Sequence, residues 1–303
     1  MSTAVFRDLS KSMGLDEDNF SDPLRLSSQW QERARVELNE EPVIARSNIE
    51  LLRSLVLSEK NLYGQTDDTF LLAFLRARKH NVEEAFKLFK NYYRLKKQFP
   101  KHLEDCLPSE KPFAYEMNGF TVLAEKDQHD RFVIGIRVEE VDLSRVRQEH
   151  FFQVLVTMLT VQIQNPLVQI AGVTVLVDMT GLSLRKAAIV TPTFARIAIR
   201  IMQDSFPLRM KAIHIVFEPL YFDAIFALFK PFLKEKMRRR IYLHGYDLIS
   251  LHAAIPRRVL PPNLKGLAQD WNFHAFRRDI ERHENKIREW RKFGYGKKPQ
   301  GVE

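Results

Sequence analysis

The side chains that could do chemistry are few and widely spaced. His214 and Glu218 lie four residues apart in the run IHIVFE, so on an extended strand both point to the same face. An imidazole and a carboxylate at this spacing are suited to metal binding or to acid–base catalysis. Polar groups that satisfy hydrogen bonds at the end of a strand are the simpler interpretation of this pair.

Asp178 and Cys106 are the other candidates. Asp178 precedes Gly181 as an acid does at the end of a nucleotide-binding strand, but no glycine-rich turn comes before it, which favours a turn or helix cap. Cys106 is the only cysteine and has no evident histidine partner, and P-loop, GxGxxG and GxSxG motifs are absent. We therefore expect no enzyme activity, no metal site, no cofactor and a reducing compartment such as the cytoplasm.

The net charge of +9 favours acidic partners, either nucleic acid or an anionic membrane surface. The tail at 277–298 is basic but interrupted by acidic residues throughout. That pattern is typical of an amphipathic helix that packs Ile280, Ile287 and Trp290 against the protein. We therefore expect no nucleic-acid partner.

The segment PLYFDAIFALFKPFL at 219–233 is the most informative, because Asp223 and Lys230 are its only charged residues. A helix that is apolar all round is either a core helix or faces apolar material. The run KEKMRRR at 234–240 follows, and such a run by itself is usually a solvated surface. Together the two segments favour docking on anionic lipid, at about 1 kcal/mol per basic side chain near the surface.

No uninterrupted apolar run approaches the roughly 18 residues of a membrane span. Residues 1–18 are too polar for a secretory signal and too acidic for a typical transit peptide. We expect a cytoplasmic protein that associates peripherally and reversibly with membranes, endosomes being one candidate.

Helical periodicity organises the first third of the chain. A helix is expected at 30–38, and further helices after Asp67 and Asn81, whose side chains can cap free N–H groups. The sequence thus predicts an N-terminal arm at 1–45 and a helical domain at 46–110.

Beyond this region the pattern changes to an α/β fold. A polar turn separates the first two of four strand-forming runs, as in a hairpin, and the last two runs are continuously apolar like buried strands. A long helix is expected at 144–164. Helices alternating with strands predict a mixed sheet with flanking helices over 111–275, followed by a basic C-terminal helix and tail at 276–303. The strand-forming runs are 120–127, 131–138, 172–181 and 212–219.

Six motifs resemble the CRAL-TRIO lipid-carrier family over about 48–270, in particular its tocopherol and retinaldehyde carrier branch. They are FLRAR (74–78), KNYY (90–93), VDMTG (177–181), DSFPLRMKAIHIVFEP (204–219), FKPFLKEKMRRRIYLHG (229–245) and LPPNLKG (260–266). The resemblance implies a helical N-terminal domain followed by a mixed β-sheet domain with a hydrophobic cavity. It also implies that 219–233 is a mobile gate, with the apolar residues Leu220, Phe222, Ile225, Phe226, Phe229, Phe232 and Leu233.

A basic cleft beside the gate binds phosphoinositide phosphates in the tocopherol branch. The resemblance assigns this cleft to Arg78, Arg209, Lys211, Lys236 and Arg240. Lysine and arginine supply the donors that a multiply charged phosphate requires. For Arg78 an ion pair on a helix surface is the alternative.

The resemblance further implies a set of cavity-lining residues, for each of which ordinary core packing is the alternative. They are Phe151, Val154, Leu155, Met158, Leu159, Val175, Val177, Ile197, Ile201, Ile213, Ile215, Phe226 and Phe229. Gln153 and Thr157 align with two small hydroxyl positions that contact the ligand in the tocopherol carrier, which argues against tocopherol itself. The turn at 260–266 lacks the acid and one glycine of the family's usual Leu-Pro-x-Glu-aromatic-Gly-Gly sequence.

The expected function is an intracellular carrier of a small hydrophobic ligand, a retinoid, a tocopherol-like molecule or another lipid. The ligand would be bound in a gated cavity and exchanged at phosphoinositide-containing membranes. The alternative is a scaffold whose protein contacts are switched by a lipid that it does not transfer.

Overall fold

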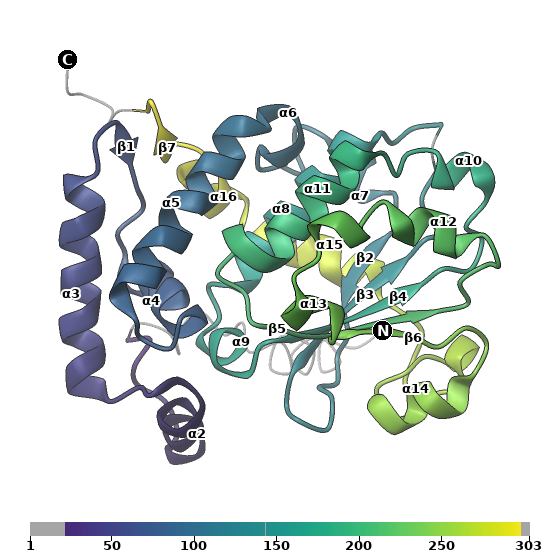
Figure 1. Ribbon diagram of the computed structural model, residues 1–303, viewed down its shortest axis with the longest axis horizontal. Coiled ribbons are helices and arrows are strands. Elements are labelled where there is room, and N and C mark those ends of the chain that lie inside the picture. Colours follow the sequence, from purple (N-terminus) through teal and green to yellow (C-terminus); the bar gives the residue numbers. More distant parts are fainter. Residues whose placement is uncertain (1–21, 143, 298–303) are drawn as a thin grey trace.

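The computed structural model describes residues 22–142 and 144–297. Its centre is a five-stranded sheet in the order β2-β3-β4-β5-β6, with the helical region at the N-terminal side of the chain beside it (Figure 1). Strand β2 is antiparallel to β3 and all other neighbours are parallel, so the hairpin and the mixed sheet are confirmed. The strands are Phe120–Val122, Phe132–Arg137, Val173–Asp178, Met210–Val216 and Ile241–Leu243.

The sheet is covered on both faces, as the apolar runs of β4 and β5 predict. On one face, alternate strand residues pack against α8 (Gln148–Gln162) and α11 (Pro192–Arg200). On the other face, Leu176 and Val216 pack against Leu251 of α14 (Leu248–Ala254) in a second apolar cluster. Two apolar layers therefore flank the sheet.

The N-terminal helices begin where the capping residues predict. Asp67 accepts a hydrogen bond from Phe70 N–H at 3.0 Å and starts α4 (Asp68–Ala77). Asn81 accepts one from Glu84 N–H at 3.0 Å and starts α5. The predicted helix at 30–38 is confirmed as α2. Besides α4, the helices of this region are α2 (Ser28–Leu38), α3 (Pro42–Ser58), α5 (Val82–Gln98), α6 (Pro100–Leu103) and α7 (Pro112–Tyr115).

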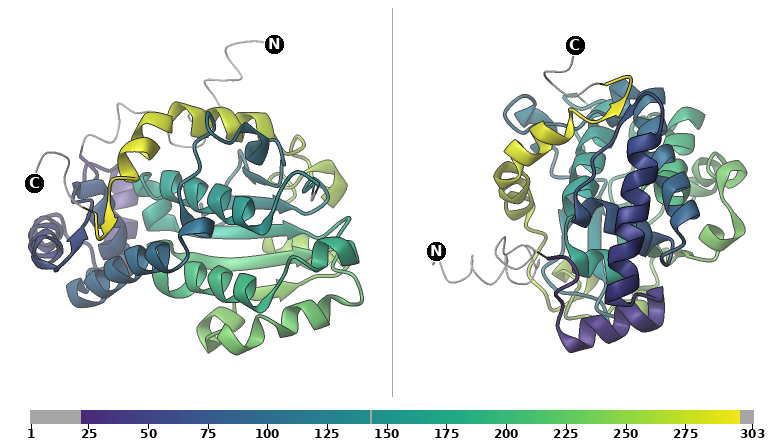
Figure 2. Two further views of the ribbon diagram at one scale, coloured as in Figure 1. Left: turned by 90° about the horizontal axis from the view of Figure 1, so that it is seen from above. Right: turned by 90° about the vertical axis from the view of Figure 1, so that its left-hand side faces the viewer.

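The C-terminal helices α15 (Phe273–Arg282) and α16 (Glu284–Trp290) run along one side of the molecule (Figure 2). Ile280 and Ile287 are fully buried and Trp290 is partly buried, which confirms the predicted amphipathic pattern. Beyond α16, β7 (Gly294–Tyr295) pairs with β1 (Leu62–Tyr63), so the end of the described chain returns to the N-terminal helices. Within residues 22–142 and 144–297, no helix is long and apolar enough to cross a membrane.

The segment at 219–233 is not the single helix that its composition suggested. It forms α12 (Phe222–Ala227) and a short 3₁₀ turn, η3 (Lys230–Phe232), before α13 (Glu235–Arg238). Pro231 has no N–H to donate and interrupts the helical hydrogen bonds. The short edge strand β6, directly after the basic run, was not predicted. The remaining elements are α9 (Pro166–Ala171), α10 (Leu184–Ala187), the π-helix η2 (Ile201–Ser205) and the 3₁₀ turn η4 (Pro262–Leu264).

Candidate ligand cavity and basic cleft

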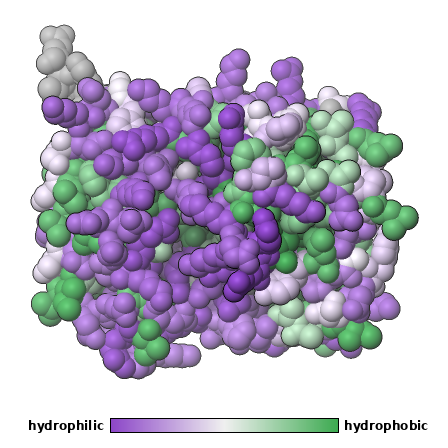
Figure 3. Space-filling model, in the orientation of Figure 1, coloured by the Kyte–Doolittle hydropathy of each residue, from purple (hydrophilic) through white to green (hydrophobic). Residues whose placement is uncertain are grey.

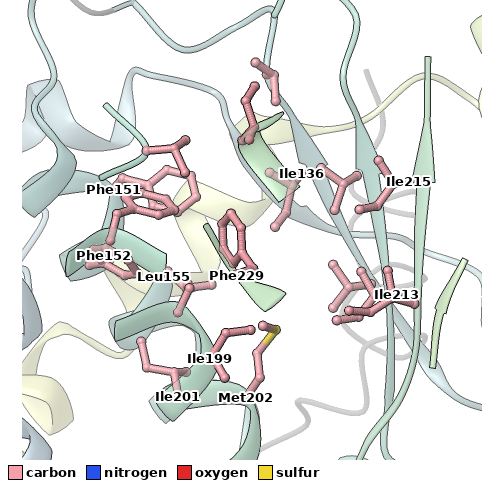
Figure 4. A pocket seen from close by; sticks show the side chains of 18 of the residues that line it. Ile136, Phe151, Phe152, Leu155, Ile199, Ile201, Met202, Ile213, Ile215 and Phe229 are labelled. Atoms are coloured by element: carbon pink, nitrogen blue, oxygen red, sulfur yellow. The ribbon is translucent and has the colours of Figure 1, made fainter. Parts of the chain in front are cut away.

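An apolar cavity of about 260 Å³ lies between the sheet, α8, α11 and α12 (Figure 4). Among the described residues of its wall, Lys186 is the one that is not apolar. The Lys186 ammonium donates hydrogen bonds to the carbonyls of Val138 at 2.8 Å and Glu139 at 2.7 Å, so its charge is satisfied by the protein. The lining therefore suits a hydrophobic molecule and offers few polar groups to orient one.

The floor of the cavity is made by the sheet. Every second residue of a strand points to the same face, and the pairing register aligns these residues across three strands. The six side chains are β-branched, and such side chains have few rotamers, so this floor is stiff. One row is Ile134, Val175 and Ile213, and the next is Ile136, Val177 and Ile215.

Helix α8 forms one wall of the cavity, and only part of the predicted lining lies on it. Phe151, Leu155 and Leu159 repeat every four residues and line the cavity as predicted. Val154 and Met158 do not line it and are fully buried in the core. On a helix they lie on the stripe next to that of Phe151 and Leu155, which turns them away from the ligand space.

The adjoining wall is formed by α11 and by the π-helix that follows it. After α11 the chain continues as the π-helix η2, in which Ile201 and Met202 line the cavity. Ile197 was predicted to line it but is fully buried beside it. Ile197 precedes the π-helix, within the regular turns of α11, and lies on the stripe beside that of Phe194 and Ala198, which line the cavity. Sequence reasoning also missed Phe152, Phe194 and Ile199, all part of the wall.

The gate segment closes the cavity. Five of its seven predicted apolar residues line the cavity, and Phe229 projects toward the strands in Figure 4. Leu220 is fully exposed and Phe232 is partly buried without lining the cavity, so these two face elsewhere. The five that line it are Phe222, Ile225, Phe226, Phe229 and Leu233.

Both ends of the gate are hydrogen-bonded to the rest of the domain. The Tyr221 hydroxyl donates to the carbonyl of Leu182. At the other end, Gln203 Nε2 donates to the carbonyl of Phe232 at 3.0 Å, and Lys234 pairs with Asp204. These contacts tie both ends of the segment at 219–233 to the rest of the domain.

The basic residues predicted for the cleft converge beside the gate. Arg209 directly precedes β5 and Arg240 directly precedes β6, and because these strands are parallel, their beginnings meet at one edge of the sheet. Lys236 lies on α13 between them in sequence. Burial, followed by repulsion from the positive charges of Arg240, Arg78, Lys79 and Arg209, lowers the pKa of Lys236. Clustered cations of this kind form an anion-binding surface.

Lys211 joins the same cluster, and two of its members were missed. Burial, followed by repulsion from Arg209, lowers the pKa of Lys211, and Arg131 adds to this repulsion. Arg131 directly precedes β3 and therefore lies at the same edge of the sheet. Arg131 could have been found only from the strand order, whereas Lys79 joins the cluster because it directly follows Arg78 at the end of α4. Within the described ranges Arg78 has no ion pair within 4 Å, although the carboxylates of Asp204 and Glu84 are near enough to favour its charged form.

Two of the basic residues are already paired. The carboxylate of Glu37 on α2 accepts hydrogen bonds from Arg209 at 2.8 Å and from Lys211 at 3.0 Å. Burial raises the pKa of Glu37, but these hydrogen bonds outweigh it and bring the pKa down to about 2. Nothing in the sequence pointed to this contact.

Comparison with known proteins agrees with this architecture. The family description "CRAL/TRIO, N-terminal domain" matches residues 48–91, and "CRAL/TRIO domain" matches residues 116–266. The human protein "Alpha-tocopherol transfer protein-like" is 38% identical over 246 residues, covering 79% of this chain and 72% of the relative. The chain belongs to the CRAL-TRIO family. The resemblance identified from its motifs is therefore confirmed.

The chain is also similar to two clavesins and to one solved structure. Clavesin-2 of Rattus norvegicus is 33% identical over 262 residues, covering 86% of this chain and 80% of the relative. Clavesin-1 of Pongo abelii is 34% identical over 259 residues, covering 84% of this chain and 73% of the relative. The solved structure of Sfh5 covers 78% of this chain and 92% of its own, at 14% identity and a TM-score of 0.45.

The turn at 260–266 departs from the CRAL-TRIO pattern and is nevertheless formed. Asn263, in place of the usual acid, donates to Asp178 Oδ2 at 2.9 Å, so Asp178 braces the turn. Lys265, in place of a glycine, has a left-handed backbone with φ of +51°. At Gly266 a Cβ atom would lie 1.8 Å from the carbonyl oxygen of Leu260, so glycine is required there.

The other candidates for chemistry have structural partners in this CRAL-TRIO domain. His214 and His244 share a hydrogen bond at 2.9 Å, and burial lowers the pKa of His214 to about 4. Glu218 accepts a hydrogen bond from Gly245 N–H at 2.8 Å. Cys106 is buried, and burial raises its pKa to about 11. No group of three or more potential metal ligands occurs among the described residues.

Proposed function

We propose that this chain carries one hydrophobic molecule in its cavity and exchanges it at membranes that contain phosphoinositides. The observation behind the proposal is the apolar cavity, in which the one charged side chain among the described lining residues, Lys186, is turned to backbone carbonyls. A chain that only packs a core leaves few voids larger than a water molecule, whereas this one keeps about 260 Å³ open.

The cavity suits a ligand held by apolar contact. Burying roughly 300 Å² of apolar ligand surface contributes about 7 kcal/mol before the free energy lost on association, enough for useful affinity without many polar contacts. Ligand pockets usually start at roughly 300 Å³, so a bulky ligand requires the gate to shift. A retinoid, a tocopherol-like molecule or another lipid fits this lining, and the name of the human relative makes tocopherol-like molecules worth testing first.

Membrane docking is supported by what surrounds the gate. Leu220 at its start is fully exposed, and Leu184 on α10 is 72% exposed. Figure 3 shows hydrophobic surface on the right-hand side of the molecule, over α10, α12 and α14, and a largely hydrophilic centre. Apolar side chains that enter the acyl boundary, next to cations that attract anionic headgroups, bring the gate to the lipid.

The ligand can be identified directly. Native mass spectrometry of the purified chain, followed by organic extraction, should find one hydrophobic molecule per chain. Transfer of a labelled lipid between vesicles then separates a carrier from a scaffold, since a scaffold retains its ligand. A chain that is empty and takes up none of the three ligand classes would contradict the proposal.

The cleft can be tested with a matched pair of variants. Lys236→Ala removes a cleft cation, whereas Arg239→Ala removes a cation of the same run that is 78% exposed at its side chain and pairs with Glu235. We expect Lys236→Ala to weaken binding to vesicles containing a phosphatidylinositol bisphosphate by about fivefold, and Arg239→Ala to weaken it less. Equal effects would show a general dependence on charge rather than a cleft.

A further inference from the structure

The proposed headgroup site already contains an anion of the protein itself. Glu37 Oε2 lies 2.8 Å from Arg209 Nη2 and 3.0 Å from Lys211 Nζ, where a phosphate oxygen would bind. The contact joins residues 172 positions apart in the chain. A carboxylate oxygen that accepts two hydrogen bonds from cations in this way stands in for one oxygen of a phosphate.

The helix that carries Glu37 is firmly placed. Ala34 and Leu38 of α2 are buried against Ile170 in a small apolar cluster. Just beyond α2, Glu40 makes two hydrogen bonds of 2.7 Å to the guanidinium of Arg76, which is fully buried. The backbone of Glu37 is therefore held in place by the packing of α2. Another anion can enter the cleft without α2 detaching.

The side chain of Glu37 has a hydrogen-bond partner outside the cleft. Its Oε1 accepts a hydrogen bond from Arg33 Nε at 2.9 Å, one turn earlier on the same helix, and the side chain is 30% exposed. A rotation away from Arg209 and Lys211 can keep the contact with Arg33. The carboxylate can thus leave the cleft while α2 stays in place.

Carboxylates are less close to the other cations of the cleft. Arg131 lies 3.9 Å from Asp127. Lys236 has no ion pair within 4 Å among the described residues, and Arg240 donates to the carbonyl of Met210 rather than to a carboxylate. The cluster is therefore divided into a part neutralised by Glu37 and a part that is open to an anion.

We propose that Glu37 is an internal competitor for the anionic headgroup, an inference that rests on the proposed phosphoinositide cleft. An anion that uses Arg209 and Lys211 must displace Glu37, so the apparent affinity is reduced by the fraction of molecules in which Glu37 has left. This factor is the same for every such anion. Headgroups with few charges then fall below useful affinity, while a phosphomonoester, with a charge of about −1.5 to −2 and three acceptor oxygens, still binds.

The test compares Glu37→Gln with Glu32→Gln in the full chain. Glu32 is on the same helix, is exposed and pairs only with Arg35 among the described residues, so it is the matched control. Binding is measured to phosphatidylcholine vesicles that contain either a phosphatidylinositol bisphosphate or phosphatidylserine. We expect Glu37→Gln to bind both about tenfold more tightly than the unmodified chain, and Glu32→Gln to match the unmodified chain. Circular dichroism and thermal melting show whether each variant is folded.

The outcomes separate this inference from the proposed function. If Glu37→Gln and the unmodified chain bind equally and both lose binding with Lys236→Ala, the competitor role is wrong and the cleft stands. If neither binds either vesicle, both ideas are overturned, because Glu37→Gln leaves two cations without their carboxylate. Binding by Glu37→Gln alone supports the competitor role and means that docking requires Glu37 to be released first.

Discussion

The side chain of Gln203 accepts a hydrogen bond from the backbone N–H of Lys234 at 2.8 Å. The same amide donates to the carbonyl of Phe232 at 3.0 Å, so one side chain holds two successive turns at the end of the gate. Gln203 belongs to η2, whose neighbouring residue Met202 lines the cavity. The wall of the cavity and the end of the gate are therefore mechanically connected.

Replacing Gln203 with alanine should loosen the gate. The variant loses two hydrogen bonds, so we expect stability to fall by about 1–2 kcal/mol and transfer of a fluorescent lipid between vesicles to become several-fold faster. Gln31→Ala is the control, since Gln31 is exposed on α2 and bonds only locally, to Leu26. A lower melting temperature with an unchanged transfer rate would show that the bond is structural and does not restrain the gate.

The corrected cavity wall can be tested by overfilling two valines. Val177→Phe projects into open volume, so we expect little loss of stability and a large loss of ligand binding. Val154→Phe adds the same volume to a closely packed part of the core, and we expect it to destabilise the fold by about 1–3 kcal/mol. Denaturant unfolding and ligand titration measure both effects. The assignment fails if Val154→Phe is the variant that blocks binding while remaining stable.

The turn at 260–266 should become more stable when its left-handed residue is glycine. Lys265 has a φ of +51°, where a side chain costs about 1–2 kcal/mol, partly offset by the greater flexibility of glycine in the unfolded chain. We expect Lys265→Gly to raise the free energy of unfolding by about 0.5–1 kcal/mol. Gly266→Ala is the opposite control and should be strongly destabilising, because its Cβ would collide with Leu260. Calorimetry would contradict this account if Lys265→Gly were less stable.

The buried pair of Glu40 and Arg76 should make the fold sensitive to acid. Burial raises the pKa of Glu40, but hydrogen bonds from Arg76 and His80 outweigh it and lower the pKa from 4.5 to about 2. A carboxyl whose pKa is lower in the folded state stabilises the fold above about pH 4.5 and loses this contribution as the pH falls toward 2.

The Glu40→Gln variant tests this dependence. It leaves Arg76 without its counter-charge, and we expect a loss of about 3 kcal/mol at neutral pH, with a shallower fall in stability between pH 4.5 and 2. Glu41→Gln, at the adjacent exposed position, should behave like the unmodified chain. Urea unfolding at a series of pH values measures both. An unchanged acid profile in Glu40→Gln would mean that other carboxylates dominate.

Local features of the fold were readable from the sequence. Asp67 and Asn81 act on N–H groups three residues ahead, so their caps depend only on neighbouring residues. The continuous apolar runs of β4 and β5 predict buried strands, because a strand that is apolar on both faces must pack against other elements on both faces. Helical spacing predicted the helix that carries Phe151, Leu155 and Leu159, and the motifs identified the family whose resemblance implied their place in the cavity.

What depends on distant contacts could not be read in this way. Local patterns were enough to predict an α/β sheet, a hydrophobic segment followed by cations, and CRAL-TRIO motifs. That Arg131 joins the cleft became visible in the folded chain, because strand order sets which residues meet at an edge of the sheet. The contact of Glu37 with Arg209 and Lys211 likewise became visible in the folded chain, because a helix docks wherever its apolar face is buried, and its charged residues then meet partners that no local pattern encodes.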